Sequence, residues 1–192
     1  MKDADFTGVI LAGGKSSRFG SNKALAEFHS RRLIEHPAGA LENIFTKRLL
    51  VTNTPDEYLF LGWPMTTDIH PGKGPLAGIH AALKTVSTPF IFVVGCDMPF
   101  PDISLIIHLC DQVPGFDAVI PATADGLEPL HGVYGRTGLP VIERCLKAEE
   151  RKITAVLQLM NTRIIETAVT ENIAGSRRPF KNINSPNDMN GI

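Results

Sequence analysis

An apolar run that ends in a glycine-rich, cationic loop lies close to the start of the chain. Residues 9–12 read Val-Ile-Leu-Ala, and Gly13 and Gly14 follow them directly. The polar stretch after this pair carries three cations, Lys15, Arg18 and Lys23. Glycine lets backbone N–H groups approach an anion closely, and arginine and lysine supply positive charge. The segment therefore predicts a phosphate-binding turn at the end of a first β-strand.

Two well-known phosphate-binding templates do not fit this loop. A P-loop needs a glycine five residues before its Gly-Lys-Ser end, and Val9 stands at that position before Gly14. The dinucleotide fingerprint Gly-x-Gly-x-x-Gly is also absent, because Gly13 and Gly14 are adjacent. A plain turn between strand and helix is the alternative interpretation, and the three cations weigh against it.

Composition excludes several classes of protein. At 192 residues and 43% hydrophobic content, the chain suits one domain, 1–192, with a full core. A net charge of -1 gives no basic field for nucleic acid. The three cysteines are far apart and form no Cys-x-x-Cys pair, which argues against a zinc ribbon or a disulfide framework. The acidic N-terminus does not resemble a signal peptide, and no apolar run approaches the roughly 18 residues of a membrane span. We therefore expect a cytoplasmic protein that binds no membrane.

Short apolar runs alternate with helix-like stretches along the whole chain. This alternation predicts the α/β class, with a doubly wound, mostly parallel, Rossmann-like sheet and helices on both faces. The expected strands are 7–12, 48–52, 65–68, 90–95, 117–122, 132–134 and 163–169. The expected helices are 32–41, 75–86, 103–112, 137–147 and 154–160. Pro75 suits a first helical turn and Asp102 suits an N-cap.

Polar side chains follow several of these strands at the point where each strand ends. In doubly wound sheets, ligands bind beyond the carboxyl ends of the strands. Asn53, Asp68 and Asp97 stand at such positions, after the second, third and fourth strands. Asp97 follows a fully apolar run, and a carboxylate there, facing a phosphate loop, suits Mg²⁺. Each of the three also has a plainer interpretation, because Asp and Asn are common in turns.

Four motifs together resemble the molybdenum cofactor guanylyltransferases, the MobA-like family within the nucleotidyltransferases. They are Leu-Ala-Gly-Gly-x-Ser-x-Arg-x-Gly-x-x-Lys-Ala-Leu at 11–25, Gly-Pro-Leu-Ala-Gly at 74–78, Cys-Asp-Met-Pro-Phe at 96–100 and Asn-Ile-Asn-x-Pro-x-Asp at 182–188. The first motif marks nucleotidyltransferases broadly, and the combination is more specific. Related cytidylyltransferases usually carry Leu-Ala-Ala-Gly, so Leu-Ala-Gly-Gly favours guanine.

The resemblance implies transfer of GMP from GTP to the phosphate of molybdopterin, with release of pyrophosphate and formation of the guanine dinucleotide cofactor. It implies Mg²⁺ as cofactor, with Asp97 as its ligand. The residues that it implies for nucleotide binding are Leu11, Ala12, Gly13, Lys23, Asn53, Asp68 and Asp97. The attacking phosphate is already ionised at neutral pH, so the reaction needs charge stabilisation and positioning rather than a general base.

The resemblance also assigns a catalytic set and an acceptor side. Arg18, Lys23 and Asp97 are the expected catalytic residues, and Asn182 and Asn184 are expected near the pterin. Transient contact with proteins that supply or receive the cofactor is a further implication. Two alternatives stay open: a cytidylyl- or sugar-phosphate nucleotidylyltransferase, and a nucleotide-binding module without turnover.

Three other features each have a functional and a plain interpretation. Cys96 next to Asp97 suggests a nucleophile, but a buried, inert thiol after an apolar strand is the expectation. His131 either touches the pterin-side substrate or serves packing. The patch Arg177, Arg178 and Lys181 either attracts a pterin phosphate or is solvated.

Overall fold

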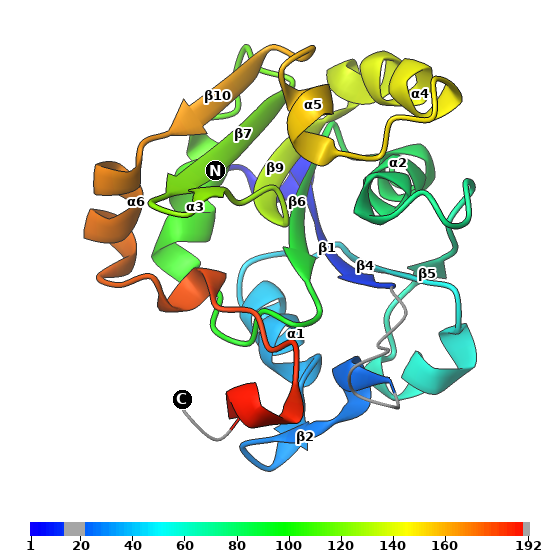
Figure 1. The fold of residues 1–192 in the computed structure, drawn as a ribbon, viewed down its shortest axis with the longest axis vertical. Coiled ribbons are helices and arrows are strands. Elements are labelled where there is room, and N and C mark those ends of the chain that lie inside the picture. The colour runs from blue at the N-terminus through cyan, green and yellow to red at the C-terminus, as the bar shows by residue number, and fades with distance from the viewer. Residues whose placement is uncertain (14–21, 190–192) are drawn as a thin grey trace.

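A mixed, mostly parallel sheet forms the centre of the molecule (Figure 1). The structure, a computed structural model, describes residues 1–13 and 22–189. The strand order is β10-β7-β9-β6-β1-β4-β5, with β8 paired to β7. Only β9 and β8 run antiparallel to their neighbours among the described strands of this sheet. The strands are β1 (Phe6–Ala12), β4 (Arg48–Thr52), β5 (Met65–Thr66), β6 (Phe90–Gly95), β7 (Ala118–Thr123), β8 (Gly126–Leu127), β9 (His131–Gly135) and β10 (Thr162–Ile165), and a separate hairpin pairs β2 (Glu27–Phe28) with β3 (Arg31–Arg32).

Helices cover both faces of the sheet, which confirms the doubly wound arrangement. Figure 1 shows α3 and α6 on one side of the sheet, and α2, α4 and α5 on the other. The α-helices are α1 (Glu35–Glu42), α2 (Pro75–Thr85), α3 (Ile103–Asp111), α4 (Leu139–Lys147), α5 (Ile153–Leu157) and α6 (Thr167–Ala174). The 3₁₀ turns are η1 (Asp3–Asp5), η2 (Lys23–Leu25), η3 (Pro55–Leu61), η4 (Arg136–Gly138), η5 (Arg178–Phe180) and η6 (Pro186–Met189).

Strand β1 is buried on both faces, as a central strand between two helix layers must be. Ile10 and Ala12 belong to the apolar cluster that also contains residues of α1 and α3. Val9 and Leu11 belong to the cluster on the opposite face, together with residues of α2 and α4. Successive side chains of a strand point to opposite faces of the sheet, so the apolar residues of β1 enter the two clusters in turn.

Two predicted helix starts carry the expected chemistry. Asp102 caps α3, because its carboxylate accepts a hydrogen bond from the backbone N–H of Leu105 at 2.8 Å. Pro75 occupies the first turn of α2, where its missing N–H costs no hydrogen bond. Strands 48–52 and 90–95 also have the predicted bounds.

The predicted strand 163–169 is wrong over its second half. Strand β10 pairs with β7 only as far as Ile165, which lies opposite Pro121. Proline has no N–H to donate, so the ladder ends there. The next residues form α6 instead, starting at Thr167.

The predicted helix 32–41 starts too early. Arg31 and Arg32 pair with Phe28 and Glu27 in the β2–β3 hairpin, so α1 starts only at Glu35. The two turn residues, His29 and Ser30, both adopt positive φ. This conformation usually calls for glycine or asparagine, so the sequence gives no hairpin signal. The remaining helix and strand bounds shift by a few residues.

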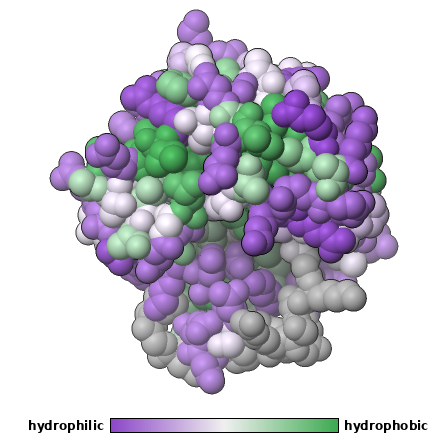
Figure 2. Space-filling model, turned by 45° about the horizontal axis from the view of Figure 1, so that its top comes forward, coloured by the Kyte–Doolittle hydropathy of each residue, from purple (hydrophilic) through white to green (hydrophobic). Residues whose placement is uncertain are grey.

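Exposed apolar side chains are spread over several elements. Leu59 lies on η3, Ile103 on α3 and Ile164 on β10. Figure 2 shows apolar areas on one face of the molecule, divided by hydrophilic residues. No helix within the described ranges combines the length and the apolarity that a membrane crossing requires.

His131, the first residue of β9, is fully buried. Its ring lies edge-on to Phe92 and Phe180, with centroid distances of 5.2 Å to each. Neither ring nitrogen has a hydrogen-bond partner among the described residues. Burial lowers the pKa of His131 to about 3, so the ring is neutral at physiological pH. The side chain therefore serves packing, the plainer of its two interpretations.

His131→Leu should make the protein less sensitive to acid. The unfolded chain binds a proton at this histidine below about pH 6.5, whereas the folded chain does not. Between pH 7.5 and pH 5 the wild type should lose about 2 kcal/mol more stability than the variant. Urea unfolding at both pH values measures this difference. An equal loss in the two proteins would contradict it.

Candidate active site

The order of the strands in the sheet reverses its direction between β1 and β6, and this reversal creates a crevice between them. In the sheet, β4 and then β5 follow on one side of β1, whereas β6 pairs with β1 on its other side. Such a switch point is where open α/β sheets bind ligands. Leu11 pairs with Gly95, and Ala12 pairs with Thr52. The residues after β1, β4 and β6 therefore emerge side by side at one edge of the sheet.

Three of the predicted site residues meet at this crevice. The Lys23 Nζ lies 2.6 Å from Asp97 Oδ2 and 3.3 Å from Asn184 Oδ1. The Lys23 and Asp97 side chains are only 21% and 18% exposed, so water weakens their attraction less than at an open surface. These residues come from the segment after the glycine loop, the end of β6 and the C-terminal segment. Figure 1 shows that last segment, in red, passing the switch point.

Backbone hydrogen bonds fix the position of Asp97. The N–H of Ile183 donates to the carbonyl of Asp97 at 2.9 Å, which ties the C-terminal segment to the end of β6. The N–H of Cys96 donates to the carbonyl of Leu11 at 3.2 Å, which ties the same turn to β1. The Ile183 side chain is fully buried against Phe28 and Leu33. Asp97 is thus held on a rigid turn from both sides.

Asn22 positions Lys23 from the preceding residue. Its Oδ1 accepts a hydrogen bond from the N–H of Ala24 at 3.1 Å, which caps η2. Its Nδ2 donates to the Tyr58 hydroxyl at 2.8 Å and to the carboxylate of Glu57. Burial raises the pKa of Tyr58 to about 12, so this phenol remains neutral. Sequence reasoning missed Asn22, although an asparagine directly before a helical turn is a recognisable cap signal.

The structure also brings Asn53 and Asp68 together, beyond the ends of β4 and β5. The Nδ2 of Asn53 donates to Asp68 Oδ2 at 3.0 Å, and the N–H of Asp68 donates to Asn53 Oδ1 at 3.1 Å. This reciprocal pairing gives both side chains a fixed orientation. Their predicted contact with the nucleoside stays a prediction.

The residues around the end of β1 occupy different environments. Leu11 and Ala12 are buried, and their side chains pack in the two apolar clusters. They can therefore meet a nucleotide through their backbone rather than their side chains. Gly13 is exposed at the edge of the crevice. Arg18 lies outside the described residues.

The acceptor-side and cysteine predictions have different outcomes. Asn184 contacts Lys23 and Asn182 is exposed, and the predicted position of both near the pterin stays a prediction. Cys96 is buried, and this burial raises the pKa of its thiol to about 12. A thiol that stays protonated at neutral pH is a poor nucleophile, so the expectation of an inert cysteine is confirmed.

Asp97 is the predicted metal ligand, and the described residues add no cluster of metal-ligating side chains around it. No group of three or more His, Cys, Asp or Glu side chains within residues 1–13 and 22–189 could hold a metal ion. This donor set does not suit zinc, which takes several protein ligands. It fits Mg²⁺, which commonly binds one or two carboxylates and completes its shell with water and substrate phosphates.

Comparisons with known proteins identify the family of the chain. Residues 8–164 match the model of the MobA-like NTP transferase domain. A probable molybdenum cofactor guanylyltransferase from Carboxydothermus hydrogenoformans is 37% identical over 186 residues, which cover 96% of this chain and 93% of that protein. The corresponding protein from Peptoclostridium acidaminophilum is 34% identical over 94% of this chain and 85% of its own length.

A solved structure extends the agreement to the fold. Molybdopterin-guanine dinucleotide biosynthesis protein A from Archaeoglobus fulgidus superposes with a TM-score of 0.83 at 27% identity. The match covers 96% of this chain and 95% of the archaeal one. The family model covers the crevice from β1 through β6, and the longer matches include the C-terminal segment as well. The chain belongs to the MobA-like NTP transferase family of nucleotidyltransferases, alongside molybdenum cofactor guanylyltransferases.

Proposed function

We propose that this protein transfers GMP from GTP to the terminal phosphate of molybdopterin and releases pyrophosphate. A phosphate oxygen of the acceptor forms a bond to the α-phosphorus of GTP, and the bond from that phosphorus to the pyrophosphate oxygen breaks. The observation that carries this proposal is the meeting of Lys23, Asp97 and Asn184 at the switch point. The names of the relatives supply the identity of the two substrates.

The main obstacle to this reaction is electrostatic, because two anions must come into contact. Lys23 supplies a partly buried positive charge, which Asn22 holds from the preceding position. Backbone hydrogen bonds fix the turn that carries Asp97, so little reorganisation is needed when charge develops. The acceptor phosphate needs no activating base, which agrees with the inert Cys96.

We propose Mg²⁺ as the cofactor and Asp97 as the protein residue that holds it. When bound, Mg²⁺ neutralises phosphate charge and orients the phosphate groups for displacement. The Asp97 carboxylate suits this role because it stands at the crevice on a fixed turn and retains 18% exposure.

The Asn53–Asp68 pair is the proposed holder of guanosine. It lies on the β4–β5 side of the switch point, and its carboxylate and amide oxygens are acceptors for the N–H and O–H groups of a nucleoside. Arg18 would add charge to the phosphate loop. A cytoplasmic location and transient contacts with proteins that deliver or take the cofactor complete the proposal.

Nucleotide choice tests the proposal against its closest rival, a cytidylyl- or sugar-phosphate nucleotidylyltransferase. GTP with Mg²⁺ should raise the melting temperature, whereas CTP, UTP and ATP should raise it much less. Incubation with GTP, Mg²⁺ and molybdopterin should then release pyrophosphate. Equal stabilisation by all four nucleotides would argue against guanine specificity, and binding without pyrophosphate release would favour a non-catalytic module.

Asp97→Asn should remove most of the activity and weaken the response to Mg²⁺. The substitution keeps the size of the side chain but removes the charge that attracts the cation. We expect turnover to fall by about a hundredfold or more, and the Mg²⁺ concentration for half-maximal rate to rise. A titration of rate against Mg²⁺ measures both. An unchanged Mg²⁺ dependence would rule out Asp97 as the ligand.

Gly95→Ala should lower activity through Asp97 without disrupting the fold. A Cβ at position 95 would lie 2.6 Å from Asp97 Oδ1, so the carboxylate has to move away. We expect turnover to fall by about tenfold or more, while the melting temperature changes little. Gly39→Ala in α1 is the matched control, because its Cβ meets nothing within 4 Å. Equal activity in the two variants would contradict the role of the carboxylate position.

A further inference from the structure

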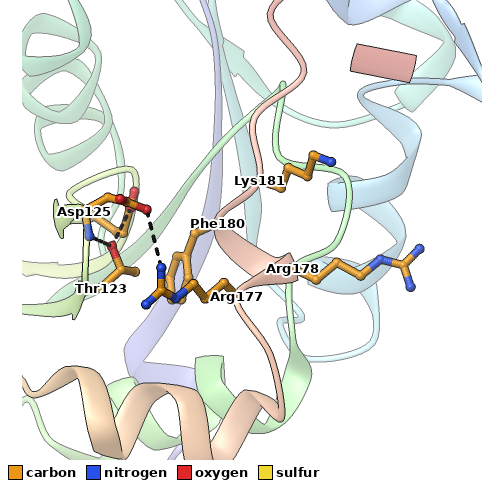
Figure 3. Close-up of a pocket in the computed structure, with 7 residues that line it drawn as sticks. Thr123, Asp125, Arg177, Arg178, Phe180 and Lys181 are labelled. Atoms are coloured by element: carbon orange, nitrogen blue, oxygen red, sulfur yellow. Dashed lines mark hydrogen bonds and ion pairs between the residues drawn. The ribbon is translucent and has the colours of Figure 1, made fainter. Parts of the chain in front are cut away.

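A second opening lies beside the switch point, on the side away from Asn53 and Asp68. Its volume is about 460 Å³. It lies between the β7–β8 turn and the segment around η5 that leads to Asn182 (Figure 3). Its lining residues are Thr123, Asp125, Glu128, Arg177, Arg178, Phe180 and Lys181. None of these residues takes part in the nucleotide half of the site.

This opening shares the edge of the sheet that carries the reaction centre. Strand β9 is antiparallel to both β6 and β7, so β6 and β7 point the same way. Thr123 therefore ends β7 at the same edge at which Gly95 ends β6. Two strand spacings, about 10 Å, separate these strands. A ligand that extends from the opening along this edge would reach Asp97.

The positive charges of the opening lie on two of its sides. Figure 3 shows Arg177 pointing at Asp125, whereas Arg178 and Lys181 extend away from the β7–β8 turn. The Arg178 guanidinium lies 4.1 Å from the centroid of the Phe100 ring, in the segment that follows Asp97. An anionic group on a bound ligand would therefore lie beside Arg178 and Lys181, and the other end of the ligand would lie near Thr123.

Glu128 gives the far end of the opening its distinctive chemistry. Its side chain is half-buried, and Oε1 accepts a hydrogen bond from the Thr123 hydroxyl at 3.3 Å. Among the described residues it forms no ion pair. Burial raises the pKa of its carboxyl. A half-buried carboxylate that keeps free acceptor capacity at the wall of an opening can accept hydrogen bonds from donor groups of a ligand.

We infer that Glu128 binds the 2-amino-4-oxo edge of the pterin ring of the acceptor, with Phe180 contributing an apolar wall. This edge presents two adjacent N–H donors, a ring N–H and an amino N–H, which match the two oxygens of a carboxylate. The inference rests on the proposed function for the identity of the acceptor. Guanine carries the same pair of donors, but the Asn53–Asp68 pair lies on the opposite side of the switch point.

Two fluorescent ring compounds test this assignment without the full acceptor. Pterin has the 2-amino group, whereas lumazine has a carbonyl oxygen at the same position. Titrations of the wild-type protein should give a dissociation constant for pterin at least tenfold lower than for lumazine, because a site built for a donor rejects an acceptor. No measurable pterin binding, or equal binding of the two rings, would overturn the inference.

Two variants then assign the discrimination to one carboxylate. Glu128→Gln should reduce the ratio between lumazine and pterin to less than about threefold, because an amide presents only one acceptor oxygen. Asp125→Asn removes the same charge from an exposed position in the same opening, and should keep the ratio of the wild type. Thermal melts confirm that both variants are folded. A Glu128→Gln protein that still discriminates would exclude Glu128.

Nucleotide measurements separate this inference from the proposed function. The affinity of Glu128→Gln for GTP should equal that of the wild type. A loss of GTP affinity as large as the loss of pterin affinity would assign the opening to guanine and overturn the inference. Pterin discrimination without GMP transfer would refute the proposed function and leave the ring site intact. GMP transfer with an unchanged molybdopterin KM in Glu128→Gln would support the function and overturn the ring site.

Discussion

The contact of Lys23 with Asp97 joins the parts of the chain on which this structure depends. Lys23 follows the glycine loop, and Asp97 lies in the turn after the central strand β6. The C-terminal segment contacts Lys23 through Asn184 and Asp97 through the backbone of Ile183. A strand buried on both faces has no room for charge, so its first polar side chain appears where the strand ends. The doubly wound order places that end beside β1, and the crevice of the nucleotidyltransferase results.

Much of this framework could be predicted because the local signals agree with the tertiary structure. Strands β4 and β6 are short apolar runs between turn residues, and Asp102 is a recognisable N-cap. The errors occur where the pairing between strands determines where an element starts or ends. The end of β10 depends on Pro121 in the neighbouring strand, and the β2–β3 hairpin turns through His29 and Ser30 at positive φ. Neither constraint is visible in the residues of the affected element.

The residues of the candidate site also separate into those that local sequence motifs predict and those that depend on distant neighbours. Lys23, Asp97 and Asn184 stand in motifs, and the parallel sheet places motif ends at one edge, so their meeting was predictable. Asn22, and Glu128 in its proposed role, were missed, because each depends on residues distant in sequence: Tyr58 for Asn22, and Phe180 in the same opening for Glu128. The role of a single asparagine or glutamate becomes clear only when the fold shows which residues lie next to it.

The hydrogen bond from Ile183 to Asp97 has a consequence for protein synthesis. The residues that build β1, β4, β5 and β6 leave the ribosome well before residue 183 does. While the chain is incomplete, the turn that carries Asp97 therefore has its tether to Leu11 but lacks the one from Ile183. The contact of Asn184 with Lys23 and the second tether of the turn form only when the last segment docks, so the C-terminal segment is the part of the chain that completes the candidate site.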